Sequence, residues 1–197
     1  MINGFLLINK DSGITSSRVV QIIKNKFNFK KVGHLGTLDP MAKGLLILAI
    51  NRATKFSSLL LQSKKSYHAE VTLGQQTDTD DAEGEITSTK DVACIEQEVK
   101  VKLLSFLGES QQFAPAYSAL KHKGKPMYKY AREGIKINKE ARTITIDQID
   151  QISIDLPKVS FHVACSKGTY IRSIARDLGN QLGCGGHLSG LIRTSQE

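Results

Sequence analysis

The sequence contains few cysteines and no paired ones. Cys94, Cys165 and Cys184 lie far apart, and no two of them form a C-x-x-C motif. This spacing argues against a disulfide framework and against a structural zinc site. Cys184 and His187 are close together, but the other cysteines and histidines are too distant in the sequence to complete a zinc site. We therefore expect a cytoplasmic protein, in a reducing compartment, without a bound metal.

Long apolar runs are also missing. Near the start of the chain only Phe5 to Ile8 are continuously apolar, and no basic segment precedes them. Such a run is too short for a signal peptide or a membrane anchor. Nothing later in the sequence reaches the length of about 20 residues that a membrane-spanning helix needs. The sequence predicts a protein without membrane attachment.

Acidic residues are outnumbered by basic ones. There are 27 lysines and arginines against 19 aspartates and glutamates, which gives a formal net charge of +8 and a pI near 9.4. The basic residues occur in short groups, as at residues 24–31, 64–65 and 121–129, and do not form a tail. Because phosphates attract such a surface independently of base sequence, the composition favours a nucleic acid as partner.

Apolar periodicity indicates a single domain of mixed structure. A chain of 197 residues with 40% hydrophobic content is long enough for one core. Short apolar or alternating runs predict strands at residues 5–8, 44–50, 67–73, 142–154 and 159–165. Helical spacing predicts helices at about residues 16–27, 54–61, 95–107 and 171–182, with a short one near the end of 115–134. Strands and helices do not alternate strictly, so the pattern indicates the α+β class.

Two segments carry more specific expectations. The first helix, capped by a residue at position 15 or 16, should bury one face formed by Val19, Ile22, Ile23 and Phe27. The acidic, turn-rich segment from Thr77 to Glu85 has no apolar periodicity and is expected to be a mobile loop.

A calcium loop is the first alternative for the acidic segment. Asp78, Asp80 and Asp81 have the composition of an EF-hand loop, but the glycine follows one position late, at Gly84. The twelfth position, Thr89, is not glutamate. We therefore assign no metal to it.

A glycine-rich loop carries the first candidate for chemistry. Asp39 stands in the sequence Leu-Asp-Pro, which by itself is a common turn. However, glycines at positions 33, 36 and 44 allow a ligand to approach the backbone closely, and His34 and Thr37 add polar groups beside the carboxylate. A phosphate-binding loop is excluded because the terminal Lys-Ser or Lys-Thr is missing. The loop is either a turn or a reactive site.

Three further residues allow both a structural and a functional interpretation. Arg172 is either a helix-surface charge or a partner that lowers the pKa of a carboxylate, since it lies one turn into a helix. Tyr67 opens a strand whose alternate residues, Ala69 to Leu73, share its face, and Tyr170 precedes the last helix. Both tyrosines fit a core equally well, but their places at element ends let a hydroxyl reach a cleft.

Taken together, these segments resemble one family. The sequence GHLGTLDPMAKGLL at residues 33–46 looks like the catalytic signature of the TruB-type tRNA pseudouridine-55 synthases. The likeness continues through KDSG at 10–13, KSY at 65–67, TDTD at 77–80, PAYSALK at 115–121 and CSKGTYIR at 165–172. The resemblance implies the pseudouridine synthase fold, a mixed, largely antiparallel sheet flanked by helices. It also implies that uridine-55 in the T-loop of tRNA is isomerised after being flipped out, without a cofactor.

The resemblance also implies a role for each matching residue. Asp39 would be the nucleophile, Tyr67 would stack on the target base, and Tyr170 and Arg172 would organise the carboxylate. Further residues are expected to contact the RNA, and these are His34, Lys10, Leu191, Lys121, Tyr128 and Arg132. Leu191 would close the pocket, and the basic, tyrosine-rich stretch at 121–132 suits a phosphate backbone. Whether the carboxylate attacks C1′ of the sugar or C6 of the base stays open.

Some positions depart from the family pattern, and some alternatives remain. Asp11 replaces a usual proline, Leu35 a frequent threonine, and Gly190 a bulkier residue. We expect residues 1–197 to form the catalytic domain, with the family's C-terminal PUA-type domain absent or truncated. We also expect a monomer that acts on the T-arm of tRNA without an obligatory protein partner. The rivals are the guide-RNA-dependent, dyskerin-like branch and a non-catalytic RNA-binding protein.

Overall fold

One sheet organises the molecule. The structure, a computed structural model, describes residues 2–118, 120–135, 137 and 140–197. Within this part of the chain, eight strands form a sheet in the order β1-β3-β12-β4-β11-β10-β7, and β2 also pairs with β3. The strands are β1 (Gly4–Lys10), β2 (Val32–His34), β3 (Lys43–Ile50), β4 (Lys65–Leu73), β7 (Gly108–Gln112), β10 (Arg142–Asp155), β11 (Lys158–Cys165) and β12 (Gly186–Gln196).

All neighbours in this sheet are antiparallel except β12 and β3, which run parallel. The predicted α+β class and the mixed, largely antiparallel sheet are therefore confirmed.

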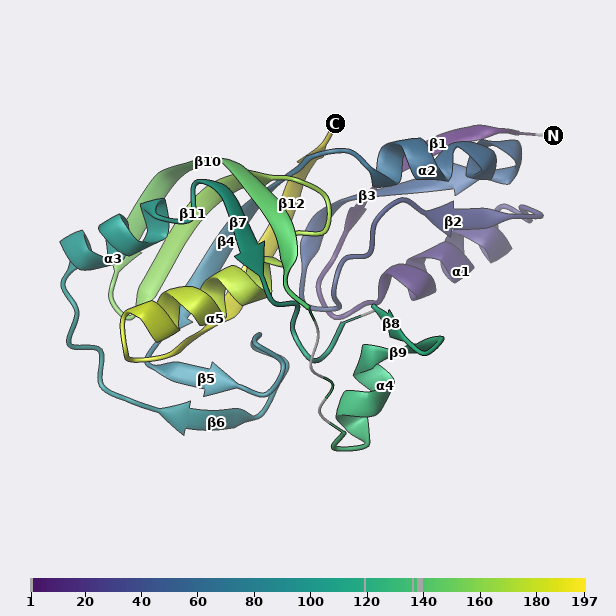
Figure 1. Ribbon diagram of the computed structural model, residues 1–197. Coiled ribbons are helices and arrows are strands. Elements are labelled where there is room, and N and C mark those ends of the chain that lie inside the picture. The colour runs from purple at the N-terminus through teal and green to yellow at the C-terminus, as the bar shows by residue number, and fades with distance from the viewer. Residues whose placement is uncertain (1, 119, 136, 138–139) are drawn as a thin grey trace.

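Helices and two small hairpins surround the sheet. The helices are α1 (Ser16–Lys26), the 3-10 helix η1 (Asn51–Phe56), α2 (Ser57–Leu61), α3 (Glu96–Leu104), α4 (Met127–Arg132) and α5 (Ile171–Gln181). The hairpins pair β5 (Gln75–Thr77) with β6 (Ile86–Thr89) and β8 (Lys121–His122) with β9 (Lys125–Pro126). In Figure 1, α5 crosses the face of the sheet, α1 and α2 lie at its N-terminal end, and α4 lies below the junction between these parts. None of the described helices is long and apolar enough to cross a membrane.

The N-terminal part of the sheet is covered on both faces. Alternate residues of β3 point to opposite sides, as the period of two of a strand requires. Leu46 and Leu48 join the main core together with Val19 of α1, whereas Ile47 and Ala49 join a smaller cluster. Residues 35–42, which connect β2 to β3, are therefore supported from both sides.

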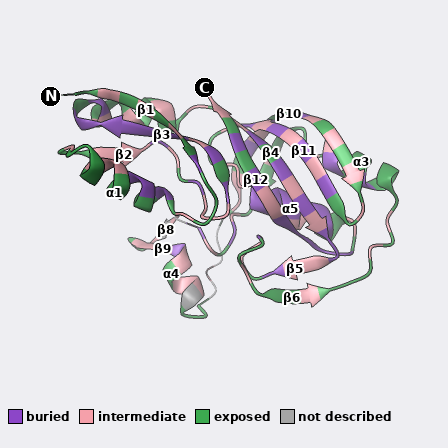
Figure 2. Cartoon of the chain, turned by 180° about the vertical axis from the view of Figure 1, so that it is seen from behind, coloured by how far each residue is buried: buried purple, intermediate pink, exposed green. Residues whose placement is uncertain are grey.

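The C-terminal part buries one face of the sheet under α5. The predicted alternation of β4 is confirmed, because Tyr67, Ala69, Val71 and Leu73 are buried and the residues between them are not. The stripe of α5 that meets them is formed by Ile171, Ile174, Ala175 and Leu178. Burying each large aliphatic side chain stabilises the fold by about 1.5–3 kcal/mol. Figure 2 shows buried residues concentrated in these strands and in α5. This packing fixes the first turn of α5 against the start of β4.

The predicted buried face of α1 was partly wrong. Ile22 and Phe27 are exposed, while Ser16, Val19 and Val20 are buried. The reason is a pair of hydrogen bonds in which the Ser16 hydroxyl accepts from the backbone N–H of residue 38 and donates to its carbonyl, at 2.9 and 2.8 Å. These bonds turn Ser16 toward the core, together with Val19 and Val20, which follow it at i+3 and i+4 on the same helix face.

The structure predicts a sharp difference between two glycines of positive φ. Gly44 has φ +95°, and a Cβ there would lie 2.3 Å from the carbonyl oxygen of Arg193. Gly108 has φ +90°, and a Cβ there would meet nothing within 4 Å. Gly108→Ala should lower the free energy of unfolding by about 1–2 kcal/mol through strain alone. Gly44→Ala should lower it by at least about 4 kcal/mol because a backbone clash is added. Urea unfolding of both variants measures the difference, and equal losses would contradict the close packing of β3 on β12.

Candidate active site

The loop between β2 and β3 presents Asp39 on a rigid base. Leu35, Leu38 and Ala42 of this loop are buried. The backbone of Leu38 is held by the side chain of Ser16, and the N–H of Ala42 donates to the carbonyl of Asp39 at 3.1 Å. With its apolar residues turned inward, the loop directs the half-buried carboxylate of Asp39 into a cavity.

Arg172 of α5 forms an ion pair with Asp39. Its Nε lies 3.0 Å from Oδ2 of Asp39, and its side chain is only 6% exposed. The Nε–H is not aligned with an acceptor among the described residues, so this contact is held by charge. The structure thus brings together the two residues that the sequence predicted to form a carboxylate–arginine pair.

The same guanidinium anchors the acidic segment. Nη1 of Arg172 lies 3.2 Å from Oδ2 of Asp81 and donates to the carbonyl of Thr79 at 3.0 Å, while Nη2 donates to the carbonyl of Tyr117 at 2.9 Å. The segment is further fixed to β12, since Ala82 N–H donates to the Leu188 carbonyl at 2.9 Å. The segment from Thr77 to Glu85, which was expected to be a mobile loop, is therefore held by an ion pair and hydrogen bonds and lines one side of the site.

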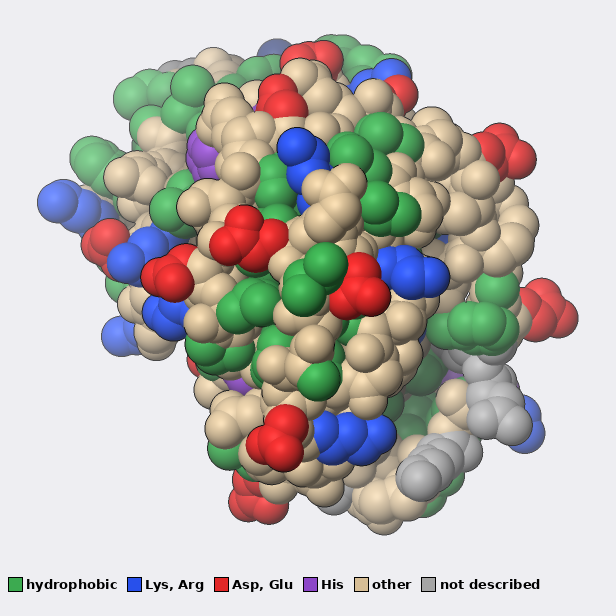
Figure 3. All heavy atoms as spheres, turned by 90° about the vertical axis from the view of Figure 1, so that its left-hand side faces the viewer, with side chains coloured by type: hydrophobic (Ala, Val, Ile, Leu, Met, Phe, Trp, Pro, Cys, Tyr) green, Lys and Arg blue, Asp and Glu red, His purple; other side chains and the backbone are tan. Residues whose placement is uncertain are grey.

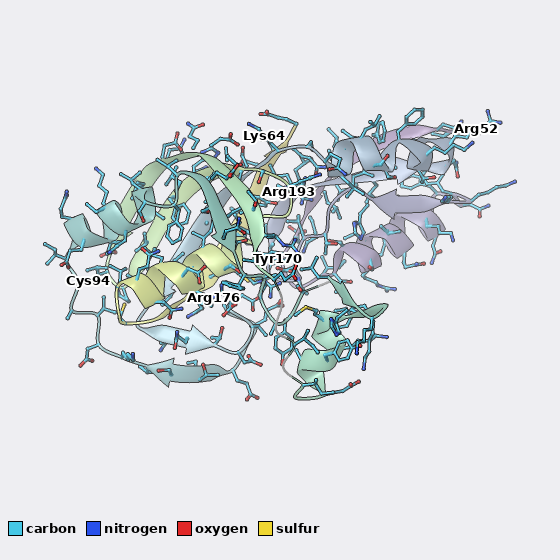
Figure 4. All side chains as sticks on the ribbon, in the orientation of Figure 1. Arg52, Lys64, Cys94, Tyr170, Arg176 and Arg193 are labelled. Carbon is cyan, nitrogen blue, oxygen red and sulfur yellow. The ribbon has the colours of Figure 1, made fainter. Side chains whose placement is uncertain are left out.

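Two aspartates of the acidic segment form ion pairs with arginines. In the part of the chain that the structure describes, no three His, Cys, Asp or Glu side chains are arranged as metal ligands. Asp80 instead pairs with Arg176 at 3.0 Å, and Asp81 pairs with Arg172. Figure 4 places Arg176 farther along α5 than Tyr170, on the side of the acidic segment. The site is built from carboxylate–arginine pairs.

Burial and the neighbouring charges have opposing effects on the pKa of Asp39. Burial raises the pKa of Asp39 above the usual carboxyl value, and the nearby Arg172 charge opposes this rise without reversing it. The neighbouring charge of Asp81 adds to the rise. The predicted effect of Arg172, which is to lower the pKa of Asp39, is therefore present, but desolvation outweighs it and the net pKa is raised.

Two cavities meet at Asp39. The first, of about 210 Å³, is lined by Thr37, Leu38, Asp39, Tyr67, Thr169, Tyr170, Ile171, Arg172 and Leu191. The second, of about 520 Å³, also includes Thr37, Asp39 and Arg172, and its other walls are Pro40, the acidic segment and residues 117, 118 and 128. The first cavity therefore unites the four predicted catalytic residues and Leu191, and its walls combine aromatic and aliphatic side chains with polar and charged ones. Such walls can both stack on a flat ring and make polar contacts with it.

The two tyrosines of the first cavity are held in different ways. Burial raises the pKa of Tyr67 to about 12, so its hydroxyl stays protonated at neutral pH. Burial also raises the pKa of Tyr170. The backbone of Tyr170 is clamped by Gln112 of β7, which accepts from its N–H at 2.8 Å and donates to its carbonyl at 3.1 Å. This clamp fixes the start of α5, and with it Arg172.

The residues predicted to contact RNA fall into different places. Lys10 is only 1% exposed, and its ammonium group donates to the carbonyls of Asp11, Ile14 and Pro40 at 2.9, 2.7 and 3.1 Å. Assigning Lys10 to RNA contact was therefore wrong, because these three carbonyls take up all three of its donors. Lys10 braces the Asp39 loop instead.

The other predicted RNA contacts remain predictions. Tyr128 lines the second cavity. His34 is half-buried at the end of β2, outside both cavities, and burial lowers its pKa. The side chains of Lys121 and Arg132 lie outside the described residues.

Sequence reasoning missed three residues that shape the site. Asp81 was read only as part of an acidic turn, and Gln112 and Arg193 were not singled out. Each contacts a partner that is 58 or more residues away in the sequence. Gln112 contacts Tyr170, Asp81 contacts Arg172, and Arg193 contacts Leu45. No local pattern in the sequence signals such contacts.

An α+β sheet that presents an arginine-paired carboxylate beside two tyrosines is suited to nucleophilic chemistry on a planar ring. Comparison with known proteins identifies the family. The family model described as TruB family pseudouridylate synthase (N terminal domain) matches residues 24–171. The tRNA pseudouridine synthase B of Alkaliphilus oremlandii (strain OhILAs) is 50% identical over 193 residues, which cover 98% of this chain and 64% of that protein. The protein of the same name from Idiomarina loihiensis is 46% identical, with 98% and 63% covered. The chain belongs to the TruB family of pseudouridylate synthases, as its sequence predicted.

Solved structures agree with this assignment. The structure titled "Crystal Structure of a Cbf5-Nop10-Gar1 Complex" matches with a TM-score of 0.73 and 32% identity, over 96% of this chain and 48% of that one. The structure titled "Structure of H/ACA RNP bound to a substrate RNA containing 2'-deoxyuridine" matches with a TM-score of 0.70 and 30% identity. The match covers 96% of this chain and 47% of that one. The chain spans a little under two thirds of the curated relatives and about half of these structural neighbours.

Proposed function

We propose that this chain isomerises the T-loop uridine-55 of tRNA to pseudouridine, with Asp39 as nucleophile. The observation that carries the proposal is the Asp39–Arg172 ion pair of 3.0 Å at a cavity that Tyr67, Tyr170 and Leu191 also line. Membership of the TruB family and 46–50% identity to enzymes named tRNA pseudouridine synthase B support it. Residues 1–197 would supply the catalytic domain.

The reaction is balanced without an oxidant or a reductant. The bond from N1 of uracil to C1′ of the ribose breaks, and a bond from C5 to C1′ forms. C5 loses a proton and N1 gains one. The protein therefore has to supply a nucleophile, a way to move the proton, and a pocket in which the uracil can turn.

Asp39 can supply the nucleophile by two routes. Its carboxylate can bond to C1′ as N1 departs, as in retaining glycosidases, or add to C6 of the base. In the first route the carboxylate leaves C1′ as C5 joins it. In the second route it leaves C6 after C5 has joined C1′, as C5 loses its proton. Arg172, which is always charged, keeps a counter-charge beside the carboxylate as it loses and regains its negative charge.

The cavity walls can hold a base that has left its stack. Taking a base out of a folded RNA loop costs a few kcal/mol, which stacking and polar contacts in the pocket must offset. Tyr67 offers an aromatic face and a protonated hydroxyl, and Leu191 an aliphatic wall. Tyr170 lies beside them at the start of α5.

The tRNA has to approach from a particular side. Figure 3 shows the end of the molecule that carries α3, and acidic and basic side chains are interspersed there with apolar ones. This end is not a basic surface, although the chain has a formal charge of +8. We therefore place the tRNA on the side where the cavities open, next to Tyr128, which lines the second cavity.

Guide-dependent modification is the second candidate, because the structural neighbours at TM-scores of 0.70 and 0.73 are described as an H/ACA RNP and a Cbf5-Nop10-Gar1 complex. The higher identity to enzymes named for tRNA, at 46–50%, favours the stand-alone reading.

One experiment tests the proposal and separates the two candidates. An unmodified tRNA transcript is incubated with the purified chain alone, and pseudouridines are mapped along it. A single new pseudouridine in the T-loop is expected, and none in a transcript whose T-loop uridine is replaced by cytidine. Product that forms only when a guide RNA and partner proteins are added would favour the guide-dependent candidate. Binding without product under either condition would contradict both.

The raised pKa of Asp39 predicts an acid limit to the reaction. Because the ionised form is the nucleophile, the single-turnover rate should fall tenfold per pH unit below the pKa of Asp39. That decline should begin above the ordinary aspartate value of about 3.9, since burial raises the pKa. Tyr67, with a pKa of about 12, should cause no loss up to pH 9. The measurement uses saturating tRNA, with circular dichroism at each pH to verify folding. A flat rate down to pH 4 in folded protein would contradict this role of Asp39.

A further inference from the structure

Arg193 of β12 and Lys10 are the two most deeply buried charged side chains among the described residues. Arg193 is only 1% exposed, although an arginine is among the costliest residues to bury. In the sheet it stands opposite Tyr67 of β4 on one side and Gly44 of β3 on the other. Figure 4 shows it where the N-terminal strands meet the rest of the sheet. Because burying a charge is costly, the contacts of this guanidinium have to offset the loss of its hydration.

Its hydrogen bonds join both ends of the loop that carries Asp39. Nη2 donates to the carbonyl of Gly36 at 3.0 Å, and Nε donates to the carbonyl of Leu45 at 2.7 Å. Gly36 precedes Asp39 by three residues, and Leu45 follows it by six. One planar guanidinium therefore sets the distance between the two stems of the loop.

The same guanidinium also acts on Tyr67. The two side chains interact, and the arginine charge opposes the effect of burial on the pKa of the tyrosine. A guanidinium has only donors, so the hydroxyl can meet it only with its oxygen. The hydroxyl hydrogen of Tyr67 is then left for a partner in the cavity.

Two glycines leave room for this arrangement. A Cβ at Gly36 would lie 3.3 Å from Nη1 of Arg193, and a Cβ at Gly44 would lie 2.3 Å from its carbonyl oxygen. Both glycines belong to the loop whose sequence pointed to a site, and both have positive φ. Part of the glycine pattern around Asp39 thus accommodates Arg193.

We propose that Arg193 is a positioning residue, which fixes the Asp39 loop and the Tyr67 hydroxyl relative to each other across the sheet. The inference rests on the proposed function, in which both groups face one uracil. Arg193 is not among the residues that line the cavity. A purely structural role would instead make Arg193 matter for stability and leave Tyr67 unaffected.

Arg193→Lys tests the proposal with the charge retained. A single ammonium cannot reproduce the fixed fork that reaches Gly36 and Leu45 together. At saturating tRNA the single-turnover rate should fall about 100-fold, as expected when reacting groups are displaced by about 1 Å. The tRNA dissociation constant should change less than about threefold. Arg52→Lys is the matched control, since Arg52 is exposed on η1 and far from Arg193 in Figure 4.

A second readout does not depend on activity. Each of the five tyrosines can be replaced by 3-fluorotyrosine, and the fluorine resonance that disappears in Tyr67→Phe belongs to position 67. That resonance should shift in Arg193→Lys and stay in place in Arg52→Lys. If Arg193→Lys does not fold, Gly36→Ala tests the same contact from the loop side and should also shift it.

The outcomes separate this inference from the proposed function. If the wild-type chain makes no pseudouridine, the proposed function fails, and the fluorine resonance alone decides whether Arg193 positions Tyr67. If the wild type is active and Arg193→Lys keeps its rate and its resonance, Arg193 is not a positioning residue. Lower stability with an unchanged rate and resonance also overturns the inference. A slower rate together with a shifted resonance supports it.

Discussion

In Asp39→Asn, pseudouridine formation at saturating tRNA is expected to fall by at least about 10⁴-fold, as for loss of a covalent nucleophile in other enzymes. The amide has almost the shape of the carboxylate, so the cavity still admits the base, but the amide cannot form the bond. The dissociation constant for tRNA should therefore change less than about threefold. Single-turnover assays and equilibrium binding on the same preparation measure the two quantities.

The same substitution should not weaken the fold. Burial raises the pKa of Asp39, so the ionised carboxylate is less favourable in the folded chain than in the unfolded one at neutral pH. Replacing it by a neutral amide removes that cost. Arg172 meanwhile keeps its contacts to Asp81, Thr79 and Tyr117. Urea unfolding at pH 7 should give a free energy no lower than that of the wild type.

Asp91→Asn is a suitable control, since it makes the same chemical change at an exposed position before α3. Its rate should equal that of the wild type. If Asp39→Asn kept more than about a tenth of the wild-type rate, Asp39 could not be the nucleophile. If it lost tRNA binding in parallel with rate, the carboxylate would serve binding instead of chemistry.

Local pattern predicted the elements that frame the site. The alternation of β4 and the apolar stripe of α5 are visible in the sequence because each depends on the periodicity of one segment. The same holds for β3, β10 and β11, and for the short helix α4. The pairing of Arg172 with Asp39 was implied by the resemblance to the TruB family. The local pattern showed only an arginine in the first turn of a helix, where it could pair with a carboxylate.

The contacts between segments that are far apart in the chain could not be predicted from the sequence. β12 has glycine, serine and arginine among its residues and does not look like a central strand, yet it lies between β3 and β4. Its partners on β4 are over 100 residues away, and no local pattern encodes that distance. Arg193 was missed for this reason. Lys10 was misassigned because its burial depends in part on the Pro40 carbonyl, 30 residues farther along the chain.

Charge at Arg172 should control both stability and the acid limit of the reaction. Arg172→Met removes a buried guanidinium and leaves two carboxylates and two carbonyls without their partner. Breaking such a buried pair from one side costs about 3–5 kcal/mol of stability. Arg172→Lys keeps the charge but cannot reach all four partners, and should cost about 2 kcal/mol and about 10²-fold in rate. Urea unfolding and single-turnover assays measure these losses.

The pH profile separates a charge effect at Arg172 from simple damage to the fold. The positive charge of Arg172 lowers the pKa of Asp39, and the negative charge of Asp81 raises it. In Arg172→Met the acid limb of the rate profile should therefore move to higher pH. In Asp81→Asn it should move to lower pH, while the amide oxygen can still accept from the Glu83 N–H, as Asp81 does at 3.0 Å. Two substitutions on one ion-pair network thus shift the same limb in opposite directions. A shift of both limbs in one direction would mean that the network acts on Asp39 through packing instead of charge.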